Sequence, residues 1–165
     1  MNDLERLLDG RLFQVGFVVR DLDTALARYT ALFGGAPWRC YTFSAAIHRQ
    51  AEYRGGPTGF SVRLALNDAS PQLELIEPVE GPGVHGDWLA GRGEGFHHVG
   101  VLVDSLDAAV ERMAAAGYAA IQTGSGFGAD GDGAYAYFDT ANDLGFLVEA
   151  VEPPERMPDP DRIWP

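Results

Sequence analysis

Four polar side chains in the sequence could together bind a divalent metal ion: Gln14, Glu74, His98 and Glu149. One imidazole, two carboxylates and an amide oxygen suit zinc, nickel, cobalt, manganese or iron(II). Four protein ligands leave positions open for water or a substrate. Glu149 alternates with Leu147 and Val151, and a carboxylate on such an apolar strand face is costly to bury unless it is paired or bound to a metal.

The rest of the composition removes several other kinds of chemistry. Cys40 is the only cysteine, which excludes an internal disulfide and a cysteine-based zinc site. All twelve basic residues are arginine, so Schiff-base chemistry and a P-loop lysine are excluded as well. A formal charge of −12 argues against nucleic acid and anionic membranes as partners. We therefore expect a small-molecule substrate.

A strand followed by a helix occurs twice in the chain. The stretch FQVGFVVRDLDTALARY (13–29) aligns with FHHVGVLVDSLDAAVERM (96–113), which places His98 on Gln14 and Gly100 on Gly16. In both copies apolar residues alternate first with a period of two and then at helical spacing. Asp21 and Ser105 stand at equivalent places and are predicted to be the N-caps of the two helices.

Three further strands are predicted after each helix. They cover about 37–44, 59–67 and 71–77 in the first half, and 118–123, 133–138 and 145–151 in the second. The stretches LELIEP (73–78) and VEAVEP (148–153) place Glu74 opposite Glu149. The chain is therefore divided into a first module (about 11–78), a glycine-rich linker (about 79–94), a second module (about 95–152) and a proline-rich tail (153–165), with Ile163 and Trp164 expected to dock the end of the tail.

All four candidate ligands occupy duplicated positions. If the two modules close on one another about a pseudo-twofold axis, these positions meet in one cluster. Taken singly, each residue has an ordinary explanation, since a glutamate near a strand end is usually exposed and an isolated histidine is usually structural. We interpret His97 as structural and facing the helix layer, and we place His48 and His85 in loops without partners at ligand spacing.

The quoted stretches, together with GFLVEAVEP (145–153), resemble the vicinal oxygen chelate superfamily over residues 11 to 153. This superfamily includes glyoxalase I, methylmalonyl-CoA epimerase, extradiol dioxygenases, and the bleomycin and fosfomycin resistance proteins. The resemblance implies an α+β fold in which two βαβββ modules curve a mixed sheet into a cup around a divalent metal. Its four ligand positions fall on Gln14, Glu74, His98 and Glu149. It also implies a homodimer.

The resemblance further implies a lyase or isomerase that abstracts a proton α to a carbonyl, as in glyoxalase I or methylmalonyl-CoA epimerase. Glu149 is the first candidate for the base and Glu74 the second. In the epimerase-like case Glu52, in the excursion at 47–59, is a further candidate, and His48, Arg49 and Tyr53 could line the mouth of the pocket. Gln14 replaces a histidine that is common at its position, which argues against an extradiol dioxygenase. The ligand set is more similar to that of glyoxalase I, and the overall sequence to the epimerases.

The alternative from another class is a metal-free binding protein similar to the antibiotic resistance members. Aromatic side chains would then hold the ligand, and the candidates are Trp38, Tyr41, Phe43, Tyr135 and Tyr137. A coenzyme A ester would need cationic contacts, for which Arg49, Arg54 and Arg92 are available. No organic cofactor is expected. The chain has no run of about 18 apolar residues and no signal-peptide pattern, so we expect a cytoplasmic protein.

Overall fold

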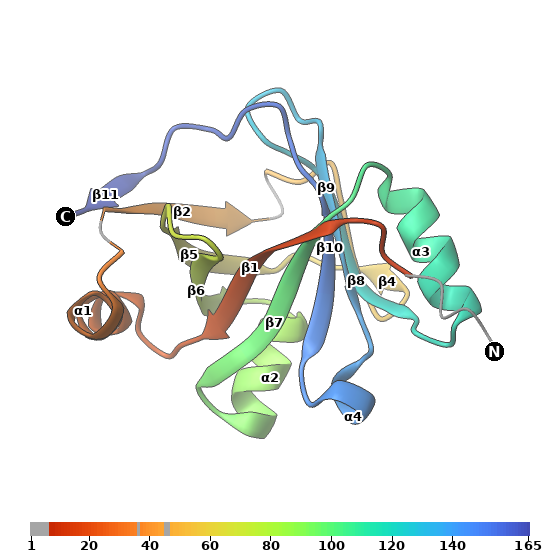
Figure 1. The fold of residues 1–165 in the computed structure, drawn as a ribbon, viewed down its shortest axis with the longest axis horizontal. Coiled ribbons are helices and arrows are strands. Elements are labelled where there is room, and N and C mark those ends of the chain that lie inside the picture. Colours follow the sequence, from red (N-terminus) through yellow and green to blue (C-terminus); the bar gives the residue numbers. More distant parts are fainter. Residues whose placement is uncertain (1–6, 36, 45–46) are drawn as a thin grey trace.

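The computed structural model describes residues 7–35, 37–44 and 47–165. Its two halves have the same element order (Figure 1). The first half contains β1 (Arg11–Val18), α1 (Leu22–Phe33), β2 (Trp38–Ser44), β5 (Ser61–Leu66) and β6 (Gln72–Glu80). The second contains β7 (Gly95–Leu102), α3 (Leu106–Ala115), β8 (Ala120–Phe127), β9 (Gly133–Phe138) and β10 (Leu147–Glu152). The duplicated strand, helix and three strands predicted from the sequence are confirmed.

Five further elements of the described residues are added to this repeat: β3 (Gln50–Tyr53), β4 (Gly56–Pro57), α2 (Val84–Arg92), α4 (Ala141–Leu144) and β11 (Arg162–Trp164). Helix α2 lies in the segment that we expected to be a glycine-rich linker. Val84 and His85 in its first turn are buried, and the Val84 amide donates to Gln122 Oε1 at 2.8 Å. Packing against the second module thus stabilises α2, although the glycines of this segment favour a loop. No helix in the described part of the chain is long and apolar enough to cross a lipid bilayer.

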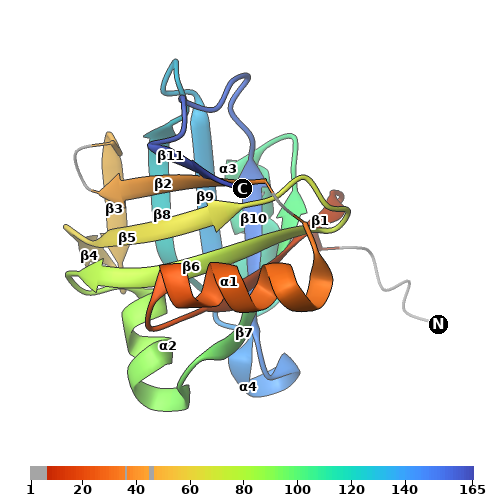
Figure 2. The same cartoon turned by 90° about the vertical axis from the view of Figure 1, so that its left-hand side faces the viewer.

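The two long helices begin at the predicted caps. The side chain of Asp21 accepts a hydrogen bond from the Thr24 amide at 2.7 Å, and Ser105 Oγ accepts one from the Ala108 amide at 3.3 Å. Such caps satisfy backbone N–H groups that have no partner inside the helix. Each helix buries its apolar stripe against the outer face of its own half of the sheet, and Figure 2 shows α1 running along β6.

The eleven strands of the described residues form one sheet in the order β11-β2-β5-β6-β1-β7-β10-β9-β8-β3-β4. The first strands of the two halves meet at its centre, where β1 and β7 are antiparallel and Val15 lies opposite Val99. On either side of this pair, β6 is parallel to β1 and β10 is parallel to β7. The remaining strands of each half are antiparallel, and the sheet does not close on itself. The predicted α+β fold with a curved mixed sheet is confirmed.

Each half of the sheet receives its edge strand from the other half. The excursion after β2 forms the β3–β4 hairpin, and β3 pairs with β8 of the second half. The tail after β10 returns to the first half, where β11 pairs with β2. Trp164 packs against the core under α1 as expected, but the side chain of Ile163 is 61% exposed and does not dock the tail, because alternate residues of a strand face opposite sides.

Candidate metal centre

The four candidate ligands lie on the four central strands of the sheet: Gln14 on β1, Glu74 on β6, His98 on β7 and Glu149 on β10. The register explains why they share one face. Gly16 pairs with Glu74 on one side and His98 on the other, whereas Gly100 pairs with Gln14 and Glu149. The two glycines are therefore equivalent positions, each between two candidate ligands.

The imidazole of His98 is at the centre of the cluster. Its Nε2 atom lies 3.2 Å from Glu74 Oε2, 3.3 Å from Glu149 Oε2 and 3.4 Å from Gln14 Oε1. All four residues are at least nine-tenths buried. One ligand atom from each of Glu74, His98 and Glu149 lies within 4.8 Å of the others. The convergence inferred from the duplication is thus present in the structure.

Gly16 and Gly100 make this convergence sterically possible. A Cβ atom on Gly16 would lie 1.9 Å from the His98 ring, and one on Gly100 would lie 3.0 Å from Cβ of Gln14. We expected each glycine to leave space beside the polar residue on its own strand. The space is in fact used across the strand pair, because His98 covers Gly16 of the other module.

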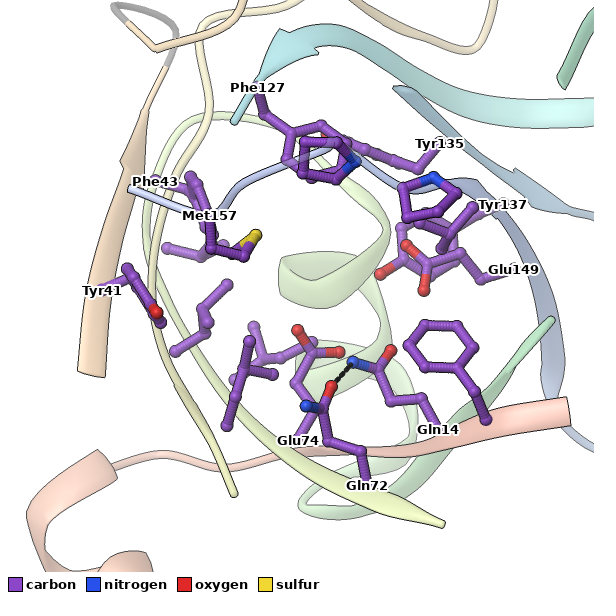
Figure 3. Close-up of a pocket in the computed structure, with 18 of the residues that line it drawn as sticks. Gln14, Tyr41, Phe43, Gln72, Glu74, Phe127, Tyr135, Tyr137, Glu149 and Met157 are labelled. Carbon is purple, nitrogen blue, oxygen red and sulfur yellow. Dashed lines mark hydrogen bonds between the residues drawn. The ribbon is translucent and has the colours of Figure 1, made fainter. Parts of the chain in front are cut away.

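The orientation of the Gln14 amide is fixed by a chain of hydrogen bonds (Figure 3). Gln14 Nε2 donates to Gln72 Oε1 at 2.8 Å, and Gln72 Nε2 donates to the carbonyl oxygen of Asn67 at 3.1 Å. Because the amide nitrogen of Gln14 is used in this way, its oxygen faces His98. Gln14 therefore offers the cluster an oxygen atom, as a metal ligand must.

A second histidine sets the orientation of His98. Nδ1 of His97 lies 2.9 Å from Nδ1 of His98, so one ring donates a proton to the other. His97 is fully buried, and the edge of its ring meets the ring of Trp88 on α2. Burial, and then the neighbouring His85 and His98, hold the pKa of His97 well below its ordinary value. A neutral His97 that accepts from His98 Nδ1 leaves His98 Nε2 free to act as a ligand.

The negative charges of Glu74 and Glu149 are not fully compensated by protons within the cluster. Burial lowers the pKa of His98, but the carboxylates of Glu149 and Glu74 outweigh this effect and raise it to about 9. Burial raises the pKa of Glu74, an effect that His98 opposes and Glu149 increases. A single N–H at His98 Nε2 cannot serve three oxygen atoms, and Glu74 Oε2 accepts no well-aligned hydrogen bond. A divalent cation would satisfy all these groups, so the residues present fit a metal.

The cluster opens into a cavity of about 270 Å³. Figure 3 shows Gln14, Glu74 and Glu149 pointing into it, with Tyr41, Phe43 and Met157 across from Glu149. His48 also lines the cavity, and its Nδ1 lies 3.0 Å from the Ser44 carbonyl oxygen. Burial lowers the pKa of His48 and so favours its neutral form. Of Glu52, the further candidate for the base, and the three residues proposed for the mouth of the pocket, His48 is the one that lines the cavity.

Glu52, Tyr53 and Arg49 do not line the cavity. The pleat of β3 points Glu52 to solvent, and the hydroxyl of Tyr53 donates to the Asp87 carboxylate on α2. The side chain of Arg49 lies against the loop that follows β8, near Gly126. We expected all three near the pocket because they belong to the excursion, but the pairing of β3 with β8 carries this segment past the rim.

Three further residues from the sequence analysis lie away from the cavity. Trp38 is buried in the outer core under α1 and is not a wall residue. Arg54 forms an ion pair with Asp87, and Arg92 donates to the Gly145 carbonyl oxygen. None of these side chains is placed to contact a ligand of the cup.

His85 was not expected at the site. It lies on α2, is 5% exposed, lines the cavity, and has Nε2 3.2 Å from the hydroxyl of Tyr137. Its place depends on the helix that the glycine-rich composition concealed. Gln72, Phe127 and Met157 also line the cavity without having been predicted there. For Gln72 a signal existed, since it shares a strand face with Glu74.

Burial of His85 in its neutral form makes folding sensitive to acid. Burial, followed by the charge of His98, lowers the pKa of His85 from 6.5 to about 3. Below pH 6.5 the unfolded chain binds a proton at His85 that the folded protein does not bind. We expect this group to reduce the free energy of unfolding as pH falls from 6.5 towards 3, by about 3 kcal/mol at a pH of about 4.5. Urea unfolding at a pH of about 6.5 and at a pH of about 4.5 measures this loss of stability in the wild type and in H85Q. An equal loss of stability in H85Q would contradict the assignment.

The family model described as the Glyoxalase/Bleomycin resistance protein/Dioxygenase superfamily matches residues 13–138. The protein therefore belongs to this superfamily, the vicinal oxygen chelate superfamily that the sequence resembles. It carries the buried Glu–His–Glu group that could bind a metal at the centre of the fold. No curated protein matches the chain in sequence.

Several solved structures share the fold. A hypothetical protein from Bacillus halodurans C-125 has 19% sequence identity and a TM-score of 0.64, with 92% of this chain and 99% of that chain covered. The methylmalonyl-CoA epimerase from Mycobacterium tuberculosis has 24% identity and a TM-score of 0.56, with 91% of each chain covered. A Streptomyces coelicolor methylmalonyl-CoA epimerase variant in complex with 2-nitronate-propionyl-CoA has 20% identity and a TM-score of 0.59, with 90% and 98% covered. At these identities the likeness shows the fold.

Proposed function

We propose that the protein is a divalent-metal-dependent lyase or isomerase that removes a proton from the carbon atom next to a carbonyl group. The observation that carries this proposal is the buried cluster in which two carboxylates and an amide oxygen surround one imidazole nitrogen. The cluster lies at a cavity large enough for a small molecule. Proton transfer needs a base within reach of the substrate, and both carboxylates line the cavity.

Gln14, Glu74, His98 and Glu149 would hold the metal ion. When bound, the ion would supply Lewis acidity that polarises the substrate carbonyl. Glu149 accepts the carbon-bound proton at a carboxylate oxygen, and Glu74 is the second candidate for this role. Tyr137 remains a hydrogen-bond donor, since burial and then the two carboxylates raise its pKa well above the ordinary value. The apolar wall of the cavity limits the access of water to the reacting carbon.

The structural neighbours give independent support for the isomerase form. One of them is a methylmalonyl-CoA epimerase in complex with methylmalonyl-CoA. Epimerisation at a carbon next to a carbonyl removes a proton from that carbon and returns it. Its fold covers 90% of this chain at 20% identity and a TM-score of 0.59. Whether the protein is a lyase or an isomerase stays open between these two predictions. The homodimer and the cytoplasmic location also stay predictions.

Metal binding is the first test. Protein purified without a metal column and treated with a chelator is titrated with Zn²⁺, Co²⁺, Ni²⁺ or Mn²⁺ in a calorimeter. We expect one ion per chain and a loss of affinity of at least about a hundredfold in H98Q, because the central nitrogen is removed. H48Q is the matched control, since His48 lines the same cavity outside the cluster. Equal affinities in H98Q and H48Q would place the ion elsewhere.

A metal-free binding protein is the second candidate, and the cavity wall is the observation that favours it. Tyr41, Phe43, Tyr135 and Tyr137, which we expected to serve such a binder, all line the cavity. The cluster opposes this alternative, because buried carboxylates without a cation are costly. If no divalent ion binds after reconstitution, the binding protein becomes the better account.

A further inference from the structure

We propose that the ligand of this site is an uncharged carbonyl compound that carries an aromatic ring or an apolar group of similar size. This inference rests on the proposed function and specifies its substrate class. It follows from the distribution of polar and apolar groups around the cavity, from the charges that are available there, and from the size of the cavity.

The wall away from the metal cluster is built from aromatic and aliphatic side chains. Strands β2, β5 and β6 contribute an inner face on which Tyr41, Val62, Leu64 and Ile76 pack together. Phe127 from β8 faces this surface, and its ring lies 6.3 Å from that of Phe43. These side chains are buried or partly buried, and they line the cavity. Burial of an apolar ligand against such a wall is favourable, whereas a polar ligand finds few hydrogen-bond partners there.

The carboxylate and amide groups that line the cavity gather at the cluster. Gln14, Glu74 and Glu149 point into the cavity together (Figure 3). A ligand that presents its carbonyl oxygen to this end places the rest of its skeleton against the aromatic wall. The site thus fits a molecule with one polar end and one apolar end.

The charges at the cavity disfavour an anionic ligand. Arg39 is the one residue with a permanent positive charge among the described residues that line it. Its guanidinium is already held by Asp68 through two hydrogen bonds of 2.9 and 2.5 Å. His48 and His85 are held neutral, because burial lowers the pKa of both. A phosphate or a carboxylate on the part of the ligand away from the cluster would therefore meet no free cation.

The size of the cavity limits the apolar group. Its volume of about 270 Å³ is almost twice the about 150 Å³ of an apolar cavity that accommodates benzene. One ring with a short side chain fills this space. The tail narrows the mouth, since Pro153, Pro154 and Met157 line the cavity and the Glu155 amide donates to Asp132 Oδ2 at 2.9 Å. Coenzyme A is far larger than the cavity and would have to lie outside it.

The test compares four probes by calorimetry with full-length protein that has been loaded with Zn²⁺. Phenylacetone has the proposed polar and apolar ends, acetone lacks the ring, phenylpyruvate adds a carboxylate, and propionyl-coenzyme A adds phosphates. We expect phenylacetone to bind at least about tenfold more tightly than each of the other three. In F127A its affinity should fall at least about fivefold, and in F33A, an exposed position on α1, it should not change. M157W, a substitution in the tail, should block binding by filling the cavity and gives a second readout if F127A does not fold.

The result that overturns the inference is tighter binding of propionyl-coenzyme A or phenylpyruvate than of phenylacetone, or equal binding of phenylacetone in the wild type and M157W. Solvent deuterium incorporation into phenylacetone and propionyl-coenzyme A is then measured on the metal-loaded protein. Phenylacetone binding without any metal uptake contradicts the proposed function and leaves this inference standing. Metal uptake with exchange only into the coenzyme A ester supports the function and overturns the inference.

Discussion

Replacing Glu149 with glutamine is expected to slow metal-dependent deuterium incorporation at the carbon next to the substrate carbonyl by about a hundredfold to ten-thousandfold. Glutamine keeps the size of the side chain but cannot accept a proton from carbon. Glu149 lines the cavity with an oxygen 3.3 Å from His98 Nε2, and this position is the basis for its two proposed roles, as a metal ligand and as the base. The measurement is proton exchange by nuclear magnetic resonance at saturating metal.

Two further variants distinguish Glu149 from Glu74 as the base. E74Q removes the other carboxylate of the cluster, and E80Q changes an exposed glutamate on the same strand as Glu74 and should have no effect. If Glu149 is the base, E149Q loses exchange even when metal occupancy is restored, whereas E74Q regains most of its exchange with added metal. The reverse pattern would assign the base to Glu74. Exchange at the wild-type rate in both variants would contradict proton abstraction by the cluster.

Replacing Gly16 with alanine is expected to remove metal binding, although Gly16 has no side chain to offer. The added methyl group would lie 1.9 Å from the ring of His98, and the rings of His97 and Tyr137 pack against that ring with centroids 5.2 Å away. We expect the affinity for the divalent ion to fall by at least about a hundredfold. We also expect the free energy of unfolding to fall by about 2 kcal/mol, because an overpacked core strains its neighbours.

Calorimetric metal titration and urea unfolding measure the two effects separately. The control is G59A, since a methyl group on Gly59 meets nothing within 4 Å and its backbone is not in the left-handed region. Unchanged metal affinity in a folded G16A protein would show that His98 can leave its place without cost to the site.

Internal duplication made much of the fold and of the candidate cluster predictable. Gln14 and His98, like Glu74 and Glu149, stand at equivalent positions of two repeated segments, so their approach required only that the modules pack with pseudo-twofold symmetry. Family membership and the α+β cup agree with this interpretation. The metal itself and the roles of the four residues stay predictions.

The parts that could not be predicted depend on contacts between segments that are distant in sequence. The excursion at 47–59 gave no sign that β3 would pair with β8, and so Glu52 was placed near the pocket. Helix α2 is stabilised by burial of Val84 and His85 against the second module, which composition does not reveal. Met157 reaches the cavity only because the tail returns to β2.

The exchange of edge strands between the two halves has a mechanical consequence. The β3–β4 hairpin belongs to the first half and pairs with the second, and the tail runs from the second half back to the first. Two segments of the chain therefore connect the walls of the cup. A hinge motion that separated the walls would have to break the backbone ladders at both ends of the sheet. Ligands are therefore expected to enter and leave at the rim, with the span between the walls held constant.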